Sequence, residues 1–179
     1  MAPRPFPWLF PYVKERDPEN NPLGVTVLRP LVEARLIGPG GREGTKVGAL
    51  VDSGSSYTLC FDWMAQEVGI DPYDGPDMLL KIAGGLRRVF FADVTLRLCP
   101  PESQGSSGAA CSAADGLDWS TPVGFIQDWA DPPWLMVLGQ FGFLDRFTVV
   151  MSRLSQALAI EDQEHFDERY GALIPVSGE

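Results

Sequence analysis

An apolar run that ends abruptly in a carboxylate constrains this chain more than any other feature. Residues 49–55 read Ala-Leu-Val-Asp-Ser-Gly-Ser. The three apolar residues are typical of a strand fixed in a core, so the carboxylate of Asp52 that follows is expected to be held rigidly. Gly54 permits a sharp turn and a close approach of another chain. Ser53 and Ser55 can donate hydrogen bonds that orient the turn and the carboxylate.

A β-hairpin is predicted to deliver Asp52. Residues 25–37 are rich in β-branched and apolar types, and Val32, Ala34 and Leu36 alternate with charged residues, which is the period of a strand. A Gly-Pro-Gly-Gly sequence at 38–41 then forces a reversal, and residues 45–51 supply the second strand.

A second hairpin follows a short helix predicted over residues 61–70. Its incoming strand ends in Ile82, its tip is Ala83-Gly84-Gly85, and its outgoing strand spans 86–91 and continues toward Leu98. Glycines at a hairpin tip supply the positive backbone angles that tight turns need.

The second half of the chain alternates loops with short strands. Residues 100–121 are small and polar, which is typical of a flexible insertion. After an apolar segment ending in Leu138 and Gly139, a short helical piece near 140–146 and strands at 147–151 and 156–160 are predicted. Strands outnumber helices and their connections are short, which favours an all-β barrel with one or two short helices.

Composition excludes several classes of function. The formal net charge is −10 over 179 residues, and nucleic-acid binding needs a basic face, so nucleic acid is not an expected partner. No run of about 18 apolar residues exists, so no membrane span is expected. Prolines interrupt the apolar residues near the start, so no signal peptide is expected and the cytoplasm is the predicted compartment.

Cysteine and histidine are too few for a metal centre. The chain has Cys60, Cys99 and Cys111, no Cys-x-x-Cys and a single histidine, His165. A structural zinc site needs four organised ligands, so no metal and no cofactor are expected. Three scattered cysteines also argue against a disulfide framework. Cys60 is expected to be a buried small residue, and His165 to be exposed and inert in an acidic tail.

The segment 49–56 resembles the active-site loop of the retropepsin-like aspartic proteases, whose pattern is apolar-apolar-Asp-Thr/Ser-Gly-Ala/Ser. The order of elements is also similar to that family. The first hairpin precedes the loop, a glycine-tipped hairpin occupies the place of the family's substrate-covering flap, and Leu138-Gly139 begins a closing segment that runs to about residue 161. The resemblance implies an all-β, single-lobe acid-protease barrel.

The resemblance also implies the roles of residues and the assembly. Asp52 would be the catalytic carboxylate, supported by Ser53, Gly54 and Ser55. Flap contacts to substrate would come from Ile82, Ala83, Gly84 and Gly85, and the cleft turn from Leu138 and Gly139. The chain has one such aspartate, whereas acid–base work needs two carboxylates about 3 Å apart that share a proton. A homodimer acting on a peptide or protein substrate is therefore expected.

The domain division that follows is an extended proline-rich arm at 1–22, a retropepsin-like domain at 23–162 and an acidic tail at 163–179. Two alternatives are open at this point. One is a catalytically inactive member of the same fold that holds peptides or a partner protein in a dimer cleft. The other is an unrelated β-barrel interaction domain in which Asp52 only closes a turn. Neither the substrate, the pH optimum nor processing of the arm follows from the sequence.

Overall fold

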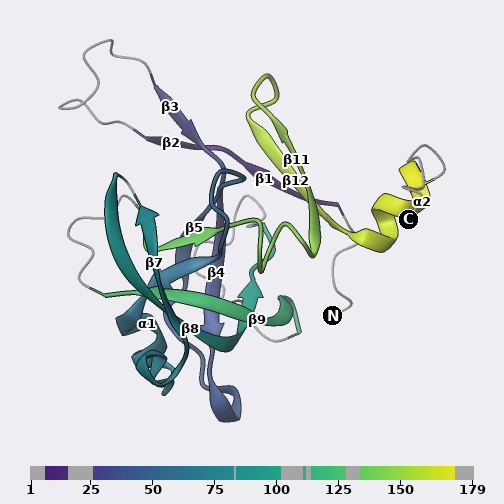
Figure 1. Cartoon of the computed structure of the whole chain (residues 1–179). Coiled ribbons are helices and arrows are strands. Elements are labelled where there is room, and N and C mark those ends of the chain that lie inside the picture. Colours follow the sequence, from purple (N-terminus) through teal and green to yellow (C-terminus); the bar gives the residue numbers. More distant parts are fainter. Residues whose placement is uncertain are drawn as a thin grey trace, which may run out of the picture.

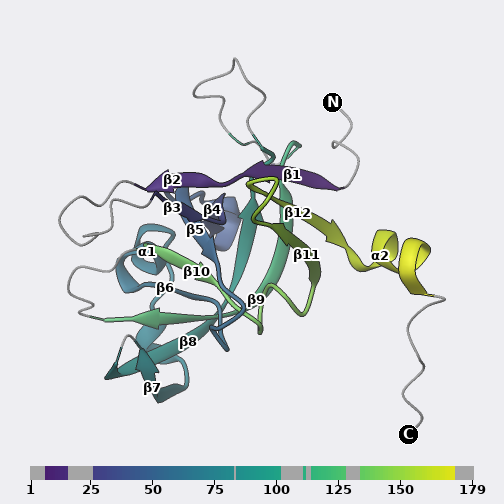
Figure 2. The same ribbon diagram turned by 90° about the horizontal axis from the view of Figure 1, so that it is seen from above.

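Six strands close into a barrel in the computed structural model, which describes residues 7–15, 26–82, 84–101, 111, 114–127 and 134–171. The strands are β4 (Leu31–Ile37), β5 (Val47–Val51), β6 (Leu59–Phe61), β8 (Gly85–Leu98), β9 (Leu117–Ile126) and β10 (Met136–Leu138). They follow the order β4-β5-β10-β6-β9-β8, and a β4–β8 pairing closes the ring. Figure 1 labels β4, β5, β8 and β9, and Figure 2 also labels β6 and β10. β7 (Asp77–Ile82) extends the sheet beside β8.

Two smaller sheets and two short helices complete the described fold. β1 (Trp8–Pro11), β12 (Ala157–Asp162) and β11 (Phe147–Ser152) form a three-stranded sheet outside the barrel (Figure 2). β2 (Val13–Glu15) pairs with β3 (Val27–Arg29). The helices are α1 (Asp62–Glu67) and α2 (Gln163–Tyr170), with 3-10 turns at Pro39–Gly41 and Pro72–Asp74. The all-β, single-lobe architecture with short helices is confirmed, and the division into arm, domain and tail remains a prediction.

The first predicted hairpin is formed by β4 and β5, where hydrophobic and charged residues alternate along β4. Val32, Ala34 and Leu36 of β4 point into the core, and Val32 faces Ala49 of β5. Pro30 divides the expected strand 25–37 into β3 and β4, because proline has no N–H to donate to a ladder. The carbonyl of Pro30 still accepts a hydrogen bond from the Val51 N–H at 3.0 Å, which anchors the strand end that precedes Asp52.

Three aromatic rings, one from β9 and two from the residues that follow β10, pack together in the core. The rings of Trp119, Phe143 and Phe147 have centroids 5.1–5.8 Å apart. The Trp119 indole N–H donates to the carbonyl of Gly142 at 2.7 Å. Trp119 is thus a packing residue, and Cys60 is buried as expected, with burial raising the pKa of its thiol.

Two local expectations are corrected. Residues 117–121 were expected within the flexible insertion, but they form the first half of β9, where Trp119 and Thr121 are buried. Residues 140–146 form consecutive turns instead of a helix. Gly142 has φ +98°, which is incompatible with a right-handed helix, and its N–H bonds the Asp145 carboxylate at 3.1 Å.

The acidic tail forms a helix that is tied to the sheet. Asp162 caps α2 by accepting a hydrogen bond from the His165 N–H at 3.0 Å. The Asp162 carboxylate also contacts the His165 ring at 2.6 Å, and this contact raises the pKa of the imidazole. Arg169 of α2 pairs with the buried Glu161 of β12. The His165 side chain is 42% exposed, as expected, and it pairs with the residue that caps the helix.

A disulfide was not expected, yet one joins Cys99 to Cys111. Their Cα atoms lie 5.5 Å apart, and the bridge links the end of β8 to the chain 12 residues later. The sequence could not predict this pairing, because only the fold brings the two cysteines together. No helix among the described residues is long and apolar enough to cross a membrane.

Replacing both bridged cysteines with serine (C99S/C111S) is expected to lower the free energy of unfolding by about 3 kcal/mol. The estimate follows from the entropy of closing a loop of roughly this length in the unfolded chain. Urea unfolding with and without dithiothreitol measures it: reductant should weaken the wild type and leave the variant unchanged. Equal midpoints for wild type and variant under non-reducing conditions would contradict the prediction.

Candidate functional site

Asp52 stands at the end of β5, where hydrogen bonds hold the backbone from both sides. β10 runs parallel to β5, with Leu138 in register with Val51. The Asp52 N–H donates to the Leu138 carbonyl at 3.0 Å, and the Val51 N–H donates to Pro30 on the opposite side. The side chain of Asp52 is half-buried. Its position is thus fixed by three strands of the barrel.

The turn after Asp52 is closed by its own carboxylate. The Gly54 N–H donates to Asp52 Oδ1 at 2.8 Å, and the Ser55 N–H donates to the Asp52 carbonyl at 3.1 Å. Asp52 Oδ2 has no hydrogen-bond partner among the described residues. One carboxylate oxygen is therefore held in place while the other is available to a water or to another acid.

The serines of the loop act differently from each other. The Ser55 hydroxyl donates to the Tyr57 carbonyl at 2.7 Å, which holds the far side of the turn. Ser53 contributes its backbone carbonyl, which accepts a hydrogen bond from Gln140 Nε2 at 2.8 Å. Ser53 is exposed. The Ser55 hydroxyl thus orients the turn as expected, whereas neither serine hydroxyl donates to the Asp52 carboxylate among the described residues; the Gly54 N–H makes that bond instead.

The turn at Leu138 and Gly139 lies directly against the Asp52 loop. The Gly139 N–H donates to the Thr58 hydroxyl at 3.2 Å, and the Gln140 N–H donates to the Ser55 carbonyl at 2.8 Å. A Cβ atom on Gly139 would lie only 2.3 Å from the Tyr57 carbonyl oxygen. Only glycine permits this approach. The fold thus brings the two predicted parts of the site together.

The predicted flap is the hairpin of β7 and β8, which projects beyond the barrel (Figure 1). Ile82 pairs with Gly85, and Gly84 at the tip has φ +83°. Ala83, also predicted to contact substrate, lies outside the described residues. No hydrogen bond joins the tip to the Asp52 loop among the described residues.

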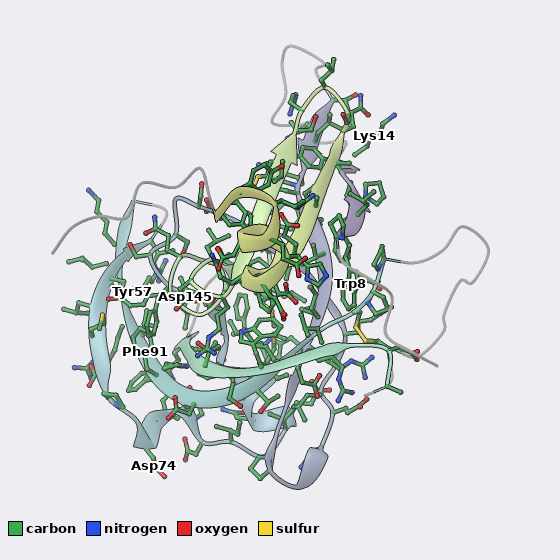
Figure 3. The ribbon with its side chains drawn as sticks, turned by 90° about the vertical axis from the view of Figure 1, so that its right-hand side faces the viewer. Trp8, Lys14, Tyr57, Asp74, Phe91 and Asp145 are labelled. Atoms are coloured by element: carbon green, nitrogen blue, oxygen red, sulfur yellow. A yellow bond between two sulfur atoms is a disulfide. The ribbon has the colours of Figure 1, made fainter. Side chains whose placement is uncertain are left out.

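An apolar cluster connects the hairpin to the Asp52 loop. We call it the cleft cluster; it consists of Leu59, Val89, Phe91, Ile126 and Val137, with Tyr57, Leu80, Ile82 and Trp134 packed against it. The Tyr57 and Phe91 rings meet edge to face, with their centroids 5.3 Å apart. Figure 3 labels both side chains, which lie next to each other. Because Tyr57 follows the Asp52 turn and Ile82 precedes the hairpin tip, one cluster borders both predicted parts.

Sequence reasoning missed Thr58 and Gln140. Thr58 is fully buried, and its hydroxyl bonds the Gly139 N–H, while Gln140 reaches Ser53. The available signal was the hydroxyl of Thr58 directly before the apolar residues 59–61. A hydroxyl next to such a run is expected to be buried, and a buried hydroxyl needs a hydrogen-bond partner. Gln140 gave no signal, because its contact depends on the turn after β10. No group of three or more His, Cys, Asp or Glu side chains able to hold a metal occurs in the described part of the chain.

Comparison with known proteins gives matches to solved structures alone. No protein-family model and no curated protein matches the chain. A crystal structure of a retropepsin-like aspartic protease from Rickettsia conorii is 14% identical, with a TM-score of 0.42, covering 84% of this chain and 95% of that one. The solution structure of the simian foamy virus (mac) protease is 17% identical, with a TM-score of 0.31, covering 62% of this chain and 87% of that one.

The order of elements agrees with the sequence-based expectation for the fold. A hairpin (β4–β5) leads to the aspartate loop, a glycine-tipped hairpin (β7–β8) follows, and β10 returns beside β5 before the last strands. The chain therefore has a single-lobe, mostly β fold built on a closed barrel of six strands, with the order of elements that the sequence predicts.

Proposed function

We propose that this chain is an aspartic endopeptidase whose active site forms when two copies place their Asp52 carboxylates face to face. The observation that carries the proposal is the way the fold holds Asp52. Its backbone is fixed by three strands, one carboxylate oxygen is bonded in the turn, and the other has no hydrogen-bond partner in the described part of the chain. A single carboxylate of this kind cannot be acid and base in the same step. Two that share a proton can.

In the proposed reaction, one Asp52 carboxylate accepts a proton from a water molecule as the water oxygen attacks the scissile carbonyl carbon. The protonated Asp52 of the other copy donates its proton to the carbonyl oxygen. The tetrahedral intermediate then breaks its C–N bond: the leaving amine takes up the proton that the first carboxylate accepted, and one hydroxyl of the intermediate returns a proton to the second carboxylate as the product carboxyl group forms. The scheme uses neither a metal nor a covalent intermediate, and the pair of carboxylates regains its shared proton.

The substrate is expected to bind as an extended strand between the cleft floor and the hairpin of β7 and β8. Backbone hydrogen bonds would then give affinity, and alternate side chains would give specificity. The hairpin has to move to admit the peptide. Gly84, already at a positive φ, makes a change at the tip inexpensive.

Incubation of the full chain with a peptide library, with and without a statine-type inhibitor, tests the proposal. The hydroxyl of statine mimics the tetrahedral intermediate. We expect cleavage of a subset of peptides and its loss with the inhibitor. Binding of peptides without cleavage at any pH from 3 to 8 would instead support an inactive peptide-binding dimer.

A further inference from the structure

The hairpin of β7 and β8 is basic, although the chain as a whole is acidic. The chain has a formal net charge of −10, but this hairpin carries Lys81, Arg87 and Arg88 within eight residues. The positions of these cations on the two faces of the hairpin decide what they can contact.

The strand register separates the three cations. Leu80 faces Arg87 across the hairpin, while Lys81 faces Leu86, and Leu79 faces Arg88. Side chains alternate between the two faces of a strand, so Arg87 lies on the same face as Val89 and Phe91. That face packs onto the cleft cluster. Lys81 and Arg88 lie on the opposite, outer face.

Arg87 differs from Arg88 in its partners as well as in its face. Arg88 is 64% exposed and pairs with Asp77 at 2.9 Å. Arg87 is half-buried and has no ion pair or hydrogen bond among the described residues. A guanidinium that is partly removed from water and lacks a partner gains from a carboxylate that arrives with a ligand.

A second cation borders the same cluster from the other side. Arg29 precedes Pro30, whose carbonyl holds the Val51 N–H beside Asp52. The Arg29 guanidinium lies over the Trp134 ring at 5.5 Å from its centroid, and Trp134 packs against the cleft cluster. Arg29 and Arg87 thus place two guanidinium groups beside the cleft cluster, and of these two Arg87 is the one available to a carboxylate of a ligand.

We propose that Arg87 is a specificity-determining residue that binds an acidic side chain of the peptide substrate. This inference rests on the proposed function. Arg suits the role because its planar fork can hold a carboxylate through two parallel hydrogen bonds. Alternate side chains of an extended peptide face the hairpin, and the dimer brings one Arg87 to each side of the scissile bond. The preference for Glu or Asp should therefore occur at one position on each side of that bond and vanish at the immediate neighbours of these positions.

Matched peptides test the inference. A peptide cleaved by the wild type is synthesised with Glu or Gln at each position in turn, and kcat/KM is measured for every pair. We expect a preference for Glu of about 10- to 100-fold at one position on each side of the scissile bond. In Arg87→Gln the Glu/Gln ratio at these positions should fall to about 1, and Arg87→Glu should favour Lys there. Arg88→Gln, on the outer face, should keep the wild-type ratio.

Binding separates this inference from the proposed function. Anisotropy with fluorescein-labelled Glu and Gln peptides is measured on Asp52→Asn and on Asp52→Asn/Arg87→Gln. Glu-selective binding that needs Arg87, together with no cleavage by the wild type, would sink the protease proposal and leave the role of Arg87 standing. Cleavage without a Glu preference, or a preference that survives Arg87→Gln, would overturn the role of Arg87 alone. Absence of both cleavage and Glu-selective binding would overturn both.

Discussion

Asp52→Asn is expected to fold and self-associate like the wild type and to lose about 1,000-fold or more in kcat/KM for peptide hydrolysis. The amide oxygen can still accept the Gly54 N–H bond that Asp52 Oδ1 accepts at 2.8 Å, so the turn should survive. An amide can neither take a proton from water nor share one with a partner carboxylate. The assay is cleavage of a library-derived peptide at several pH values, with urea unfolding as the check on folding.

Asp74→Asn is the matched control for this variant. Asp74 is an exposed carboxylate in the 3-10 turn 72–74 and lies well away from Tyr57 of the cleft cluster (Figure 3). It makes the same change of charge without touching the Asp52 loop, so its activity should stay within about two-fold of the wild type. Hydrolysis by Asp52→Asn at the wild-type rate would mean that another group does the chemistry.

Gly139→Ala is expected to lower the free energy of unfolding by about 2–3 kcal/mol and to abolish activity at the same time. The added Cβ would meet the Tyr57 carbonyl oxygen at 2.3 Å and the Ser55 carbonyl oxygen at 2.8 Å. Both atoms belong to the backbone and cannot rotate away. The Asp52 loop would have to move from β10, and the Thr58 bond to the Gly139 N–H would lengthen or break.

Gly48→Ala provides the comparison for this substitution. Gly48 lies in β5, the strand that leads to Asp52. A Cβ atom there would have only Leu31 Cδ1 nearby, at 4.0 Å. Its stability should change by no more than about 1 kcal/mol, in the stabilising direction if at all. Urea midpoints of the two variants, measured side by side, decide the matter. Equal midpoints would show that the turn and the loop are not in close contact.

The two strands that lead to Asp52 could be predicted from the sequence, because the residue patterns that indicate them are local. The alternation of Val32, Ala34 and Leu36 gave the inward face of β4, and the run before Asp52 gave β5. The glycine-tipped hairpin at 79–91 was predicted for the same reason, since its turn residues and its strands are adjacent in the chain. Pairing between distant segments, such as β10 beside β5, was not predicted; the resemblance placed only the turn at Leu138 and Gly139 in the cleft.

Other features could not be predicted because they depend on how separate elements meet or on which residues of two strands are paired. The bond from Gln140 to Ser53 joins residues 87 positions apart, and the Cys99–Cys111 bridge depends on how β8 ends. The strand formed by 117–121 was hidden by the small polar residues before it. The inward face of Arg87 depends on hairpin register, which a slip of one residue would invert.

An active site made from two copies of Asp52 binds one inhibitor for every two chains, because the statine hydroxyl has to lie between both carboxylates. Isothermal calorimetry with a statine-type inhibitor measures the number of inhibitor molecules bound per chain. We expect one inhibitor for every two chains, and no binding of comparable affinity to Asp52→Asn. A stoichiometry of one inhibitor per chain, or equal affinity for wild type and Asp52→Asn, would contradict it.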